Sequence, residues 1–222
     1  GPCRATAPSP TGHGTHVAGI IAAPVNGVGI QGVAPEAEII GVKVLRSSTG
    51  AGSFSWILGG ILYAVAIEAD VINMSLGTTF DRINRGGGGA GALVAALNRA
   101  INHATASGVL VVSAAGNDGL DLNGRLWAIP AQSGGGMAVS ATAPVAQRDF
   151  DRPASYTNYG QSVVNVAAPG GDLVEGGMLA DLILAPGGRA TLTGEYEYYF
   201  AGGTSMAAPH VSALAALLVG AY

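Results

Sequence analysis

The sequence predicts an α/β fold, a three-layer domain built around a mostly parallel, doubly wound sheet. The chain has 222 residues, of which 49% are hydrophobic and 11% charged, so it can form one sizeable domain with a real core. Apolar, β-branched runs alternate with stretches of helical period, the order that gives parallel strands joined by right-handed crossovers. Most of these runs are continuous rather than alternating, as in strands buried on both faces.

Five runs are candidate strands and four stretches are candidate helices. The strands are expected at residues 38–45, 70–76, 109–114, 137–142 and 163–167, and the helices at residues 17–23, 55–69, 90–106 and 205–219. In the third helix, Leu93, Leu97 and Ile101 share one face. Gly108 follows that helix and suits a C-terminal cap.

Two further stretches are typical of surface excursions. Residues 78–91 contain four consecutive glycines, which predicts a flexible loop. Residues 170–202 are rich in glycine, and Tyr196, Tyr198 and Phe200 alternate with polar residues there, which predicts a hairpin.

Composition excludes several classes of partner. The net charge is −4 and no basic run occurs, so nucleic acid is not an expected partner. Cys3 is the only cysteine, which rules out an internal disulfide and a cysteine zinc cluster. No window approaches the ~18 uninterrupted apolar residues of a membrane span, and no phosphate-binding glycine pattern is present.

Ser205 is a candidate nucleophile. It stands in the run Gly203-Thr204-Ser205-Met206-Ala207-Ala208-Pro209-His210, at the start of a predicted helix, where free N–H groups favour developing negative charge. The alternative is a simple helix N-cap, the commonest role for such a serine. Pro209 is expected to remove the helical hydrogen bond that would engage the carbonyl of Ser205.

His13 is a candidate general base, because a serine hydroxyl needs a base within hydrogen-bond reach. It opens the run His13-Gly14-Thr15-His16-Val17-Ala18-Gly19, 192 positions before Ser205. His16 is expected to be a buried packing residue, since no carboxylate lies close enough in sequence to complete a metal site. His103 is expected to face solvent, and His210 to pack or cap.

Ligands of such sheets bind beyond the carboxyl ends of the strands. Two motifs are expected there, Ser75-Leu76-Gly77 and Ala114-Ala115-Gly116-Asn117. The amide of Asn117 could stabilise an oxyanion, or it could simply be a turn asparagine.

Four motifs together resemble those of the subtilisin-like serine proteases, the subtilases, and they occur in that family's order. They are His13 to Gly19, Val71-Ile72-Asn73-Met74-Ser75-Leu76-Gly77, Ala114 to Asn117, and Gly203 to His210. The resemblance implies that residues 1–222 form a subtilisin-like catalytic domain, and that the protein is an endopeptidase acting through an acyl-enzyme. It implies Ser205 as nucleophile, His13 as general base, and Asn117 with the Ser205 N–H as oxyanion hole.

The resemblance also implies a peptide site. Gly50, Ala51 and Gly52, with Ser75, Leu76 and Gly77, resemble the two segments that flank the substrate backbone by strand addition. Ser75 to Gly77 with Ala114, Ala115 and Gly116 would wall the pocket for P1, the residue on the amino side of the scissile bond, with Asp118 near its rim. The small side chains there leave room for a medium or large P1 group, and because no buried charge is evident, an apolar P1 residue is expected.

Residues 24–30, Pro-Val-Asn-Gly-Val-Gly-Ile, resemble the family's calcium loop. The carbonyl oxygens of Pro24, Val28 and Ile30, together with the side chain of Asn26, suit a hard cation. An ordinary Asn-Gly turn is the alternative.

One departure from the family pattern matters. A subtilase triad needs an aspartate well before the histidine, yet residues 1–15 contain no acidic residue, and the first carboxylates are Glu36 and Glu38. The sequence also stops soon after the serine helix, short of the family's C-terminal elements. We therefore expect a domain trimmed at both ends, or one part of a longer or nicked protein, with an Asp-Ser/Thr-Gly strand encoded upstream. Residues 1–222 alone are expected to be nearly inactive, because the histidine lacks its orienting carboxylate.

Two alternative functions remain compatible with the sequence. A non-catalytic peptide-binding relative, or an inactive fragment, would also lack the aspartate. A lipase-type hydrolase is disfavoured because its Gly-x-Ser-x-Gly elbow is broken at Ala207. Residues 166–172 resemble secreted bacterial subtilases, which implies an extracellular monomer acting on polypeptides, with its own propeptide as a further partner.

Overall fold

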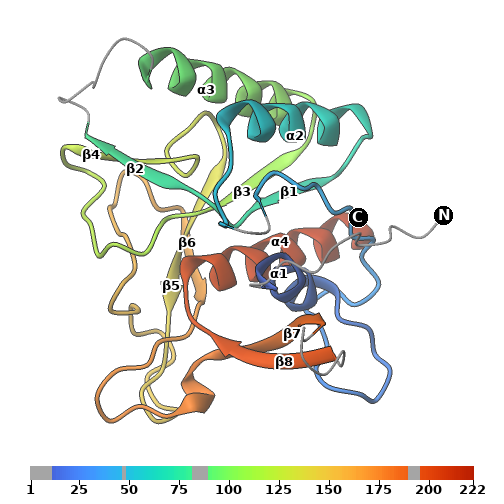
Figure 1. Ribbon diagram of the computed structural model, residues 1–222, viewed down its shortest axis with the longest axis vertical. Coiled ribbons are helices and arrows are strands. Elements are labelled where there is room, and N and C mark those ends of the chain that lie inside the picture. Colours follow the sequence, from blue (N-terminus) through green and yellow to red (C-terminus); the bar gives the residue numbers. More distant parts are fainter. Residues whose placement is uncertain (1–11, 47–48, 82–89, 190–195) are drawn as a thin grey trace.

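The computed structural model describes residues 12–46, 49–81, 90–189 and 196–222, which form three layers (Figure 1). The middle layer is a parallel sheet with the strand order β1-β3-β5-β6. These strands are β1 (Val71–Met74), β3 (Leu110–Ala114), β5 (Met137–Thr142) and β6 (Val166–Pro169). Helices α2 (Phe54–Ala66) and α3 (Ala90–Ala106) lie on one side, and α4 (Thr204–Ala221) on the other, with α1 (His13–Ala22) beside it. The predicted three-layer α/β fold is confirmed.

The central strand β3 shows why the sheet needs helices on both faces. Val111 packs in a cluster with Ile61 of α2 and Leu97 of α3, whereas its neighbour Val112 packs with Ala208 of α4. Both valines are fully buried, because successive side chains of a strand point to opposite faces. A continuous apolar run is therefore what this position requires.

Most predicted elements lie where the sequence places them. Helix α3 and strand β5 have the predicted bounds, and the other three helices and three strands of the sheet differ by a few residues at their ends. Gly108 has φ +86°, the left-handed conformation expected of a residue that ends a helix.

The prediction of a strand at residues 38–45 is wrong. Only Leu45 forms a β-bridge, an antiparallel one with Gly52, and the rest of the segment has no regular secondary structure. Ile40 is 44% exposed. A Cβ built on Gly60 of α2 would lie 3.1 Å from side-chain carbons of both Val42 and Val44, so the segment runs along that helix. An apolar, β-branched run suits an extended segment packed against a helix as well as it suits a strand.

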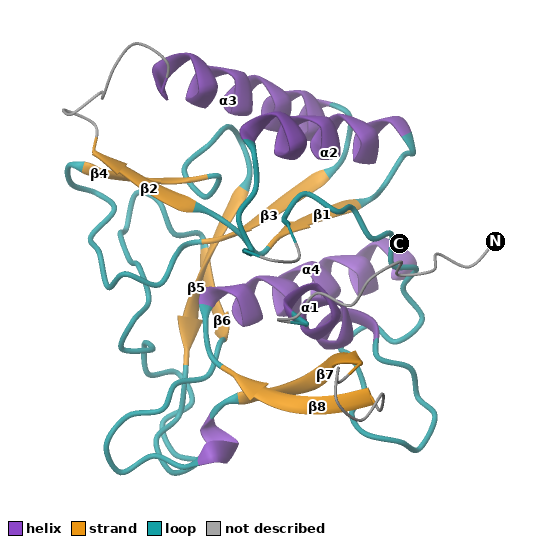
Figure 2. Ribbon diagram, in the orientation of Figure 1, coloured by secondary structure: helices purple, strands orange, loops and turns teal. Residues whose placement is uncertain are grey.

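Two antiparallel pairs complete the described structure (Figure 2). They are β2 (Thr78–Asp81) with β4 (Leu126–Ile129), and β7 (Ile183–Arg189) with β8 (Tyr196–Ala201). The second pair confirms the predicted hairpin. The first pair corrects the predicted loop at residues 78–91, since residues 78–81 form a strand. The glycines at 86–89 and Cys3 lie outside the described residues.

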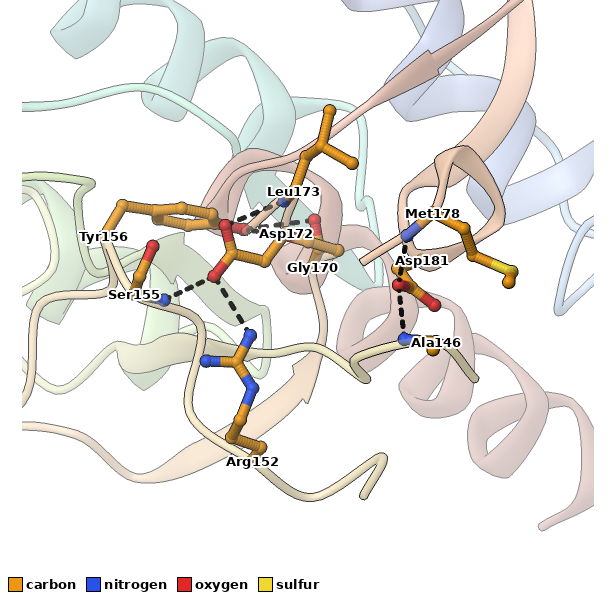
Figure 3. A network of polar contacts seen from close by, with 10 residues as sticks. Ala146, Arg152, Ser155, Tyr156, Gly170, Asp172, Leu173, Met178 and Asp181 are labelled. Atoms are coloured by element: carbon orange, nitrogen blue, oxygen red, sulfur yellow. Dashed lines mark hydrogen bonds and ion pairs between the residues drawn. The ribbon is translucent and has the colours of Figure 1, made fainter. Parts of the chain in front are cut away.

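The buried carboxylate of Asp172 joins two loops near the carboxyl ends of β5 and β6 (Figure 3). It accepts hydrogen bonds from the backbone N–H of Ser155 at 2.7 Å and of Leu173 at 2.9 Å, and from the Arg152 guanidinium at 3.2 Å. Burial alone would raise the pKa of Asp172, but these donors outweigh it and lower the pKa.

Asp181, also buried, ties the 146–147 turn to the short helix η1 (Leu179–Asp181) (Figure 3). The backbone N–H groups of Met178, Ala146 and Gln147 each donate to its carboxylate at 2.8 Å. Burial acts to raise the pKa of Asp181, yet these donors and the Gln147 side chain lower it to about 2. The fold therefore stabilises the charged form of this carboxylate.

Within the described part of the chain, α4 is the one helix whose length and apolar composition would allow a membrane span. Its first half is buried in the domain, from Thr204 through Pro209, except for half-exposed Ser205, and again at Ser212 and Ala213. Core helices of globular proteins have the same composition, so this helix is explained by its packing.

Candidate active site

Ser205 is the second residue of α4, as its motif predicts. Gly203, immediately before the helix, has φ +155° and ψ 158°, a combination that is almost confined to glycine. In the described chain no hydrogen bond engages the backbone N–H of Ser205, which is one of the free donors at a helix start. A partly exposed hydroxyl and a free N–H thus belong to the same residue.

Pro209 acts on Ser205 as the sequence predicts. A proline has no N–H to donate to the carbonyl four residues earlier, and that carbonyl belongs to Ser205. The hydroxyl of Ser75 donates to it instead, at 2.8 Å. In return, the Ser205 hydroxyl lies 3.4 Å from the carbonyl oxygen of Ser75, a long contact that leaves the hydroxyl readily displaced.

The amide of Asn117 is oriented by the residue before Ser205. Its Oδ1 accepts hydrogen bonds from both the backbone N–H and the hydroxyl of Thr204, each at 2.8 Å. Because an N–H can only donate, the amide oxygen must face Thr204, and the Nδ2 donors point elsewhere. A Cβ built on Gly203 would lie 3.3 Å from Nδ2 of Asn117 and 3.7 Å from the backbone N of Ser205. The two donors therefore border one small space that glycine leaves open.

A pocket of about 400 Å³ opens beside Ser205, at the carboxyl ends of β1 and β3. Seven of the residues expected there line it, namely Leu76, Gly77, Ala114, Ala115, Gly116, Asn117 and Asp118. Ser75 does not line the pocket; its hydroxyl is turned to Ser205. Asp118 is exposed and accepts a hydrogen bond from the Thr79 hydroxyl at 3.1 Å.

The sequence did not single out the residue that holds one wall of this pocket in place. Asn158 is 1% exposed, and its Oδ1 accepts hydrogen bonds from the backbone N–H groups of Asp118 and Leu120, both at 3.0 Å. Its Nδ2 donates to the carbonyl of Ala115 at 2.9 Å. Thr204 and the β4 residues Ala128 and Ile129 also line the pocket without having been predicted.

His13 is the first residue of α1 and is half-buried. Helix α1 packs against α4 through a cluster that includes Val17, Ile20 and Met206, so the two helices that carry His13 and Ser205 are brought together. No hydrogen bond joins His13 to Ser205 or to a carboxylate among the residues that the structure describes. Burial lowers the pKa of His13, which favours the neutral imidazole that a general base requires.

The other histidines lie as expected. His16 is fully buried, and its ring centroid lies 4.5 Å from that of Tyr199 with the two rings tilted by 41°. Its Nε2 lies 3.1 Å from the Tyr199 carbonyl oxygen. His103 is exposed. Nδ1 of His210 lies 2.8 Å from the carbonyl oxygen of Met206, one turn earlier in α4.

The segment Gly50-Ala51-Gly52 forms an exposed turn before α2. Its backbone is tied locally, since the N–H of Arg46 donates to the carbonyl of Ala51 at 2.9 Å and the N–H of Gly50 donates to the carbonyl of Arg46 at 2.9 Å. A Cβ built on Gly52 would lie 2.6 Å from the carbonyl of Val44, so this position requires glycine.

The predicted calcium loop contains an Asn-Gly turn. Oδ1 of Asn26 accepts a hydrogen bond from the backbone N–H of Val28 at 3.0 Å. Gly29 has φ +68°, and a Cβ there would overlap the Tyr198 hydroxyl, so β8 presses closely on the loop. Carbonyl and amide oxygens fit Ca²⁺ in kind, but four of them are fewer than the six to eight that Ca²⁺ takes. The loop itself supplies no carboxylate.

The three-layer fold, with a serine at the start of a core helix and an oriented asparagine beside it, is that of the subtilisin-like serine proteases. The chain belongs to this family, since the Subtilase family model (Peptidase_S8) matches residues 4–222. This confirms the resemblance carried by the four motifs.

Among relatives, the chain is 40% identical over 208 residues to the minor extracellular protease Epr of Bacillus subtilis (strain 168), covering 93% of this chain and 26% of that protein. It is 38% identical over 207 residues to an intracellular serine protease of Paenibacillus polymyxa, covering 93% and 53%. A crystal structure of a lanthipeptide protease superposes with a TM-score of 0.77 at 29% identity, covering 94% of this chain and 60% of that one. The chain thus spans between about a quarter and three fifths of each of these proteins.

Proposed function

We propose that this protein is a serine endopeptidase that hydrolyses polypeptides through an acyl-enzyme. The Ser205 hydroxyl attacks the carbonyl carbon of the scissile bond while a ring nitrogen of His13 takes its proton. His13 then gives this proton to the leaving amine, and a water molecule, activated in the same way, releases the acyl group.

The observation that carries the proposal is the pair of donors beside Ser205. Thr204 fixes the oxygen of the Asn117 amide, so that Nδ2 is available to an oxyanion together with the N–H of Ser205. Donors that are already in place when negative charge develops lower the barrier without reorganising. A helix cap would require neither this amide nor a proline that frees the Ser205 carbonyl.

The substrate is proposed to bind as an added strand. The segments Gly50-Ala51-Gly52 and Ser75-Leu76-Gly77 would flank its backbone, and the P1 side chain would enter the pocket beside Ser205. The walls formed by Leu76, Ala114 and Ala115 favour an apolar P1 residue, with Asp118 at the exposed rim.

Labelling with a fluorophosphonate probe, together with hydrolysis of casein, tests the function. In the protein as its gene encodes it, we expect stoichiometric labelling of Ser205 and casein cleavage, both abolished in Ser205→Ala. Residues 1–222 alone are predicted to label slowly, because no described carboxylate orients His13. Tight peptide binding without labelling or cleavage would favour the peptide-binding alternative, and would contradict the proposal.

Calcium is proposed as a structural cofactor of the loop at residues 24–30. Pro24, Val28 and Ile30 would contribute carbonyl oxygens and Asn26 its Oδ1, with the remaining ligands supplied from outside the loop. Adding EDTA should lower the melting temperature, and Asn26→Ala should remove most of the effect of calcium. An identical melting temperature with calcium and with EDTA would contradict this assignment.

We also propose that the protein is secreted, is made with a propeptide and acts as a monomer. Epr, by its name an extracellular protease, supports secretion, whereas a relative of nearly equal identity is named as intracellular. Mass spectrometry of the culture medium and the cell pellet decides the location. The N-terminus of the secreted form would report removal of the propeptide, and light scattering would report the oligomeric state.

A further inference from the structure

Behind Ser205, three polar side chains form a hydrogen-bonded row between α4 and β1. The hydroxyl of Ser212 donates to Oδ1 of Asn73 at 2.9 Å, and Nδ2 of Asn73 donates to the hydroxyl of Ser75 at 3.0 Å. The Ser75 hydroxyl then donates to the carbonyl of Ser205 at 2.8 Å. Ser212 is 3% exposed and Ser75 is 9% exposed, so water competes little with these bonds.

The row ends on the carbonyl of Ser205, which lacks a helical donor because Pro209 has no N–H. An unpaired buried carbonyl costs about 1–3 kcal/mol, so the Ser75 hydroxyl does what the missing N–H would have done. The donor comes from the residue that follows β1 rather than from the next turn of α4. The position of Ser205 is therefore set by the sheet as well as by its own helix.

The direction of every bond in the row follows from the requirement at Ser205. A hydroxyl carries one proton, and Ser75 uses it on the Ser205 carbonyl, so its oxygen must accept from the Asn73 amide nitrogen. This turns Oδ1 of Asn73 toward α4, where it needs a donor. Ser212 supplies that donor, although its hydroxyl also lies 3.2 Å from the Ala208 carbonyl and could bond there instead.

We propose that Ser212, seven residues after the nucleophile and away from the pocket, is a positioning residue for Ser205. It acts through Asn73 and Ser75, whose orientation it fixes. The proposal rests on the proposed function, in which Ser205 is the nucleophile. Removing the Ser212 hydroxyl leaves Oδ1 of Asn73 without its donor, lets the amide reorient, and loosens the bond that holds the Ser205 carbonyl.

The test compares Ser212→Ala with Ser113→Ala. Ser113 is 2% exposed, and its hydroxyl has no partner among the described residues, so this variant removes a buried hydroxyl without touching the row. For Ser212→Ala we expect kcat for a peptide substrate to fall about tenfold with KM within about twofold, because one weakened bond displaces the nucleophile but not the pocket. Ser113→Ala should leave both constants unchanged.

Three further measurements make the result specific. Ser212→Thr keeps the hydroxyl and should restore kcat. Asn73→Leu should lower kcat as Ser212→Ala does, and the double variant should lower it no further than the larger single effect, since both changes break one row. Amide hydrogen exchange across residues 203–210 should become faster in Ser212→Ala and stay unchanged in Ser113→Ala.

The outcomes separate this proposal from the proposed function. Unchanged exchange together with unchanged kcat in Ser212→Ala overturns the positioning role, as does faster exchange with unchanged kcat. If the unsubstituted protein is never labelled at Ser205, the proposed function fails, and hydrogen exchange alone then decides whether the row holds the start of α4. Additive losses of kcat in the Asn73→Leu/Ser212→Ala double variant would also refute the positioning role of Ser212.

Discussion

Replacing Asn158 with leucine should destabilise the protein through the wall of the pocket beside Ser205. The two side chains have similar shapes, but leucine can neither accept from the N–H groups of Asp118 and Leu120 nor donate to the carbonyl of Ala115. Three hydrogen bonds at about 1 kcal/mol each amount to a loss of about 3 kcal/mol. This is a sizeable part of the roughly 5–15 kcal/mol that stabilises a typical domain.

Urea unfolding followed by circular dichroism, with Ser205→Ala as the background to prevent self-digestion, measures this loss. The midpoint should fall by roughly 1 M, given slopes of about 3 kcal/mol per molar urea. Asn123→Ala is the control, because Asn123 is an exposed loop asparagine whose Oδ1 accepts from the N–H of Ser162 at 3.0 Å; it should cost less than about 1 kcal/mol. A loss below about 1 kcal/mol in Asn158→Leu would refute the assignment of Asn158 as the support of this wall.

Three other variants test separate parts of the structure. Asn117→Leu should lower kcat roughly 10²- to 10³-fold with little change in KM, the loss known for the oxyanion-hole asparagine of subtilisin. An unchanged kcat in a peptide nitroanilide assay would exclude the oxyanion role. The pKa of Asp181 is lowered to about 2, so the contribution of its carboxylate to stability is present above pH 4 and is lost as the pH falls through 2. The unfolding free energies of Asp181→Asn and of the unsubstituted protein should therefore converge over that range. A constant difference between them would contradict the lowered pKa. Gly19→Ala should destabilise the protein by about 1–3 kcal/mol and lower kcat, because the new Cβ would lie 2.4 Å from Pro186 Cδ and displace the helix that carries His13. Thermal unfolding measures the loss of stability, and a peptide assay measures kcat. Wild-type values of both would show that α1 packs differently.

The layers of this fold could be predicted from sequence because period and burial agree along most of the chain. Residues 109–114 form a continuous apolar run, and β3 is covered by helices on both sides. Residues 38–45 are also rich in β-branched residues, but apart from the single bridge at Leu45 they lack a strand partner in the described structure. Local composition does not encode whether a partner is present. The strand at residues 78–81 was missed for the related reason that its partner β4 lies 45 or more residues further along the chain.

The residues of the candidate site likewise divide into those that a local motif indicates and those that only the fold reveals. Ser205, Asn117 and the pocket segments could be proposed from sequence because each belongs to a motif that is continuous in sequence. Asn158 and Ser212 belong to no such motif, and their importance comes from contacts with residues far along the chain, at Ala115 and at Asn73. Thr204 could have been found, since it precedes Ser205, but its bond to Asn117 spans 87 positions and depends on the fold.

The bond between Thr204 and Asn117 also bears on how the site tolerates motion. Because Thr204 is covalently joined to Ser205, a small rigid shift of α4 would carry the Asn117 amide with it. In the proposed mechanism, the spacing between the Ser205 hydroxyl and the two N–H donors beside it would then change less than the spacing between either group and the substrate. Thermal motion of this helix would accordingly alter how often a bound peptide is in reach, while the stabilisation given to each productive encounter stays nearly the same.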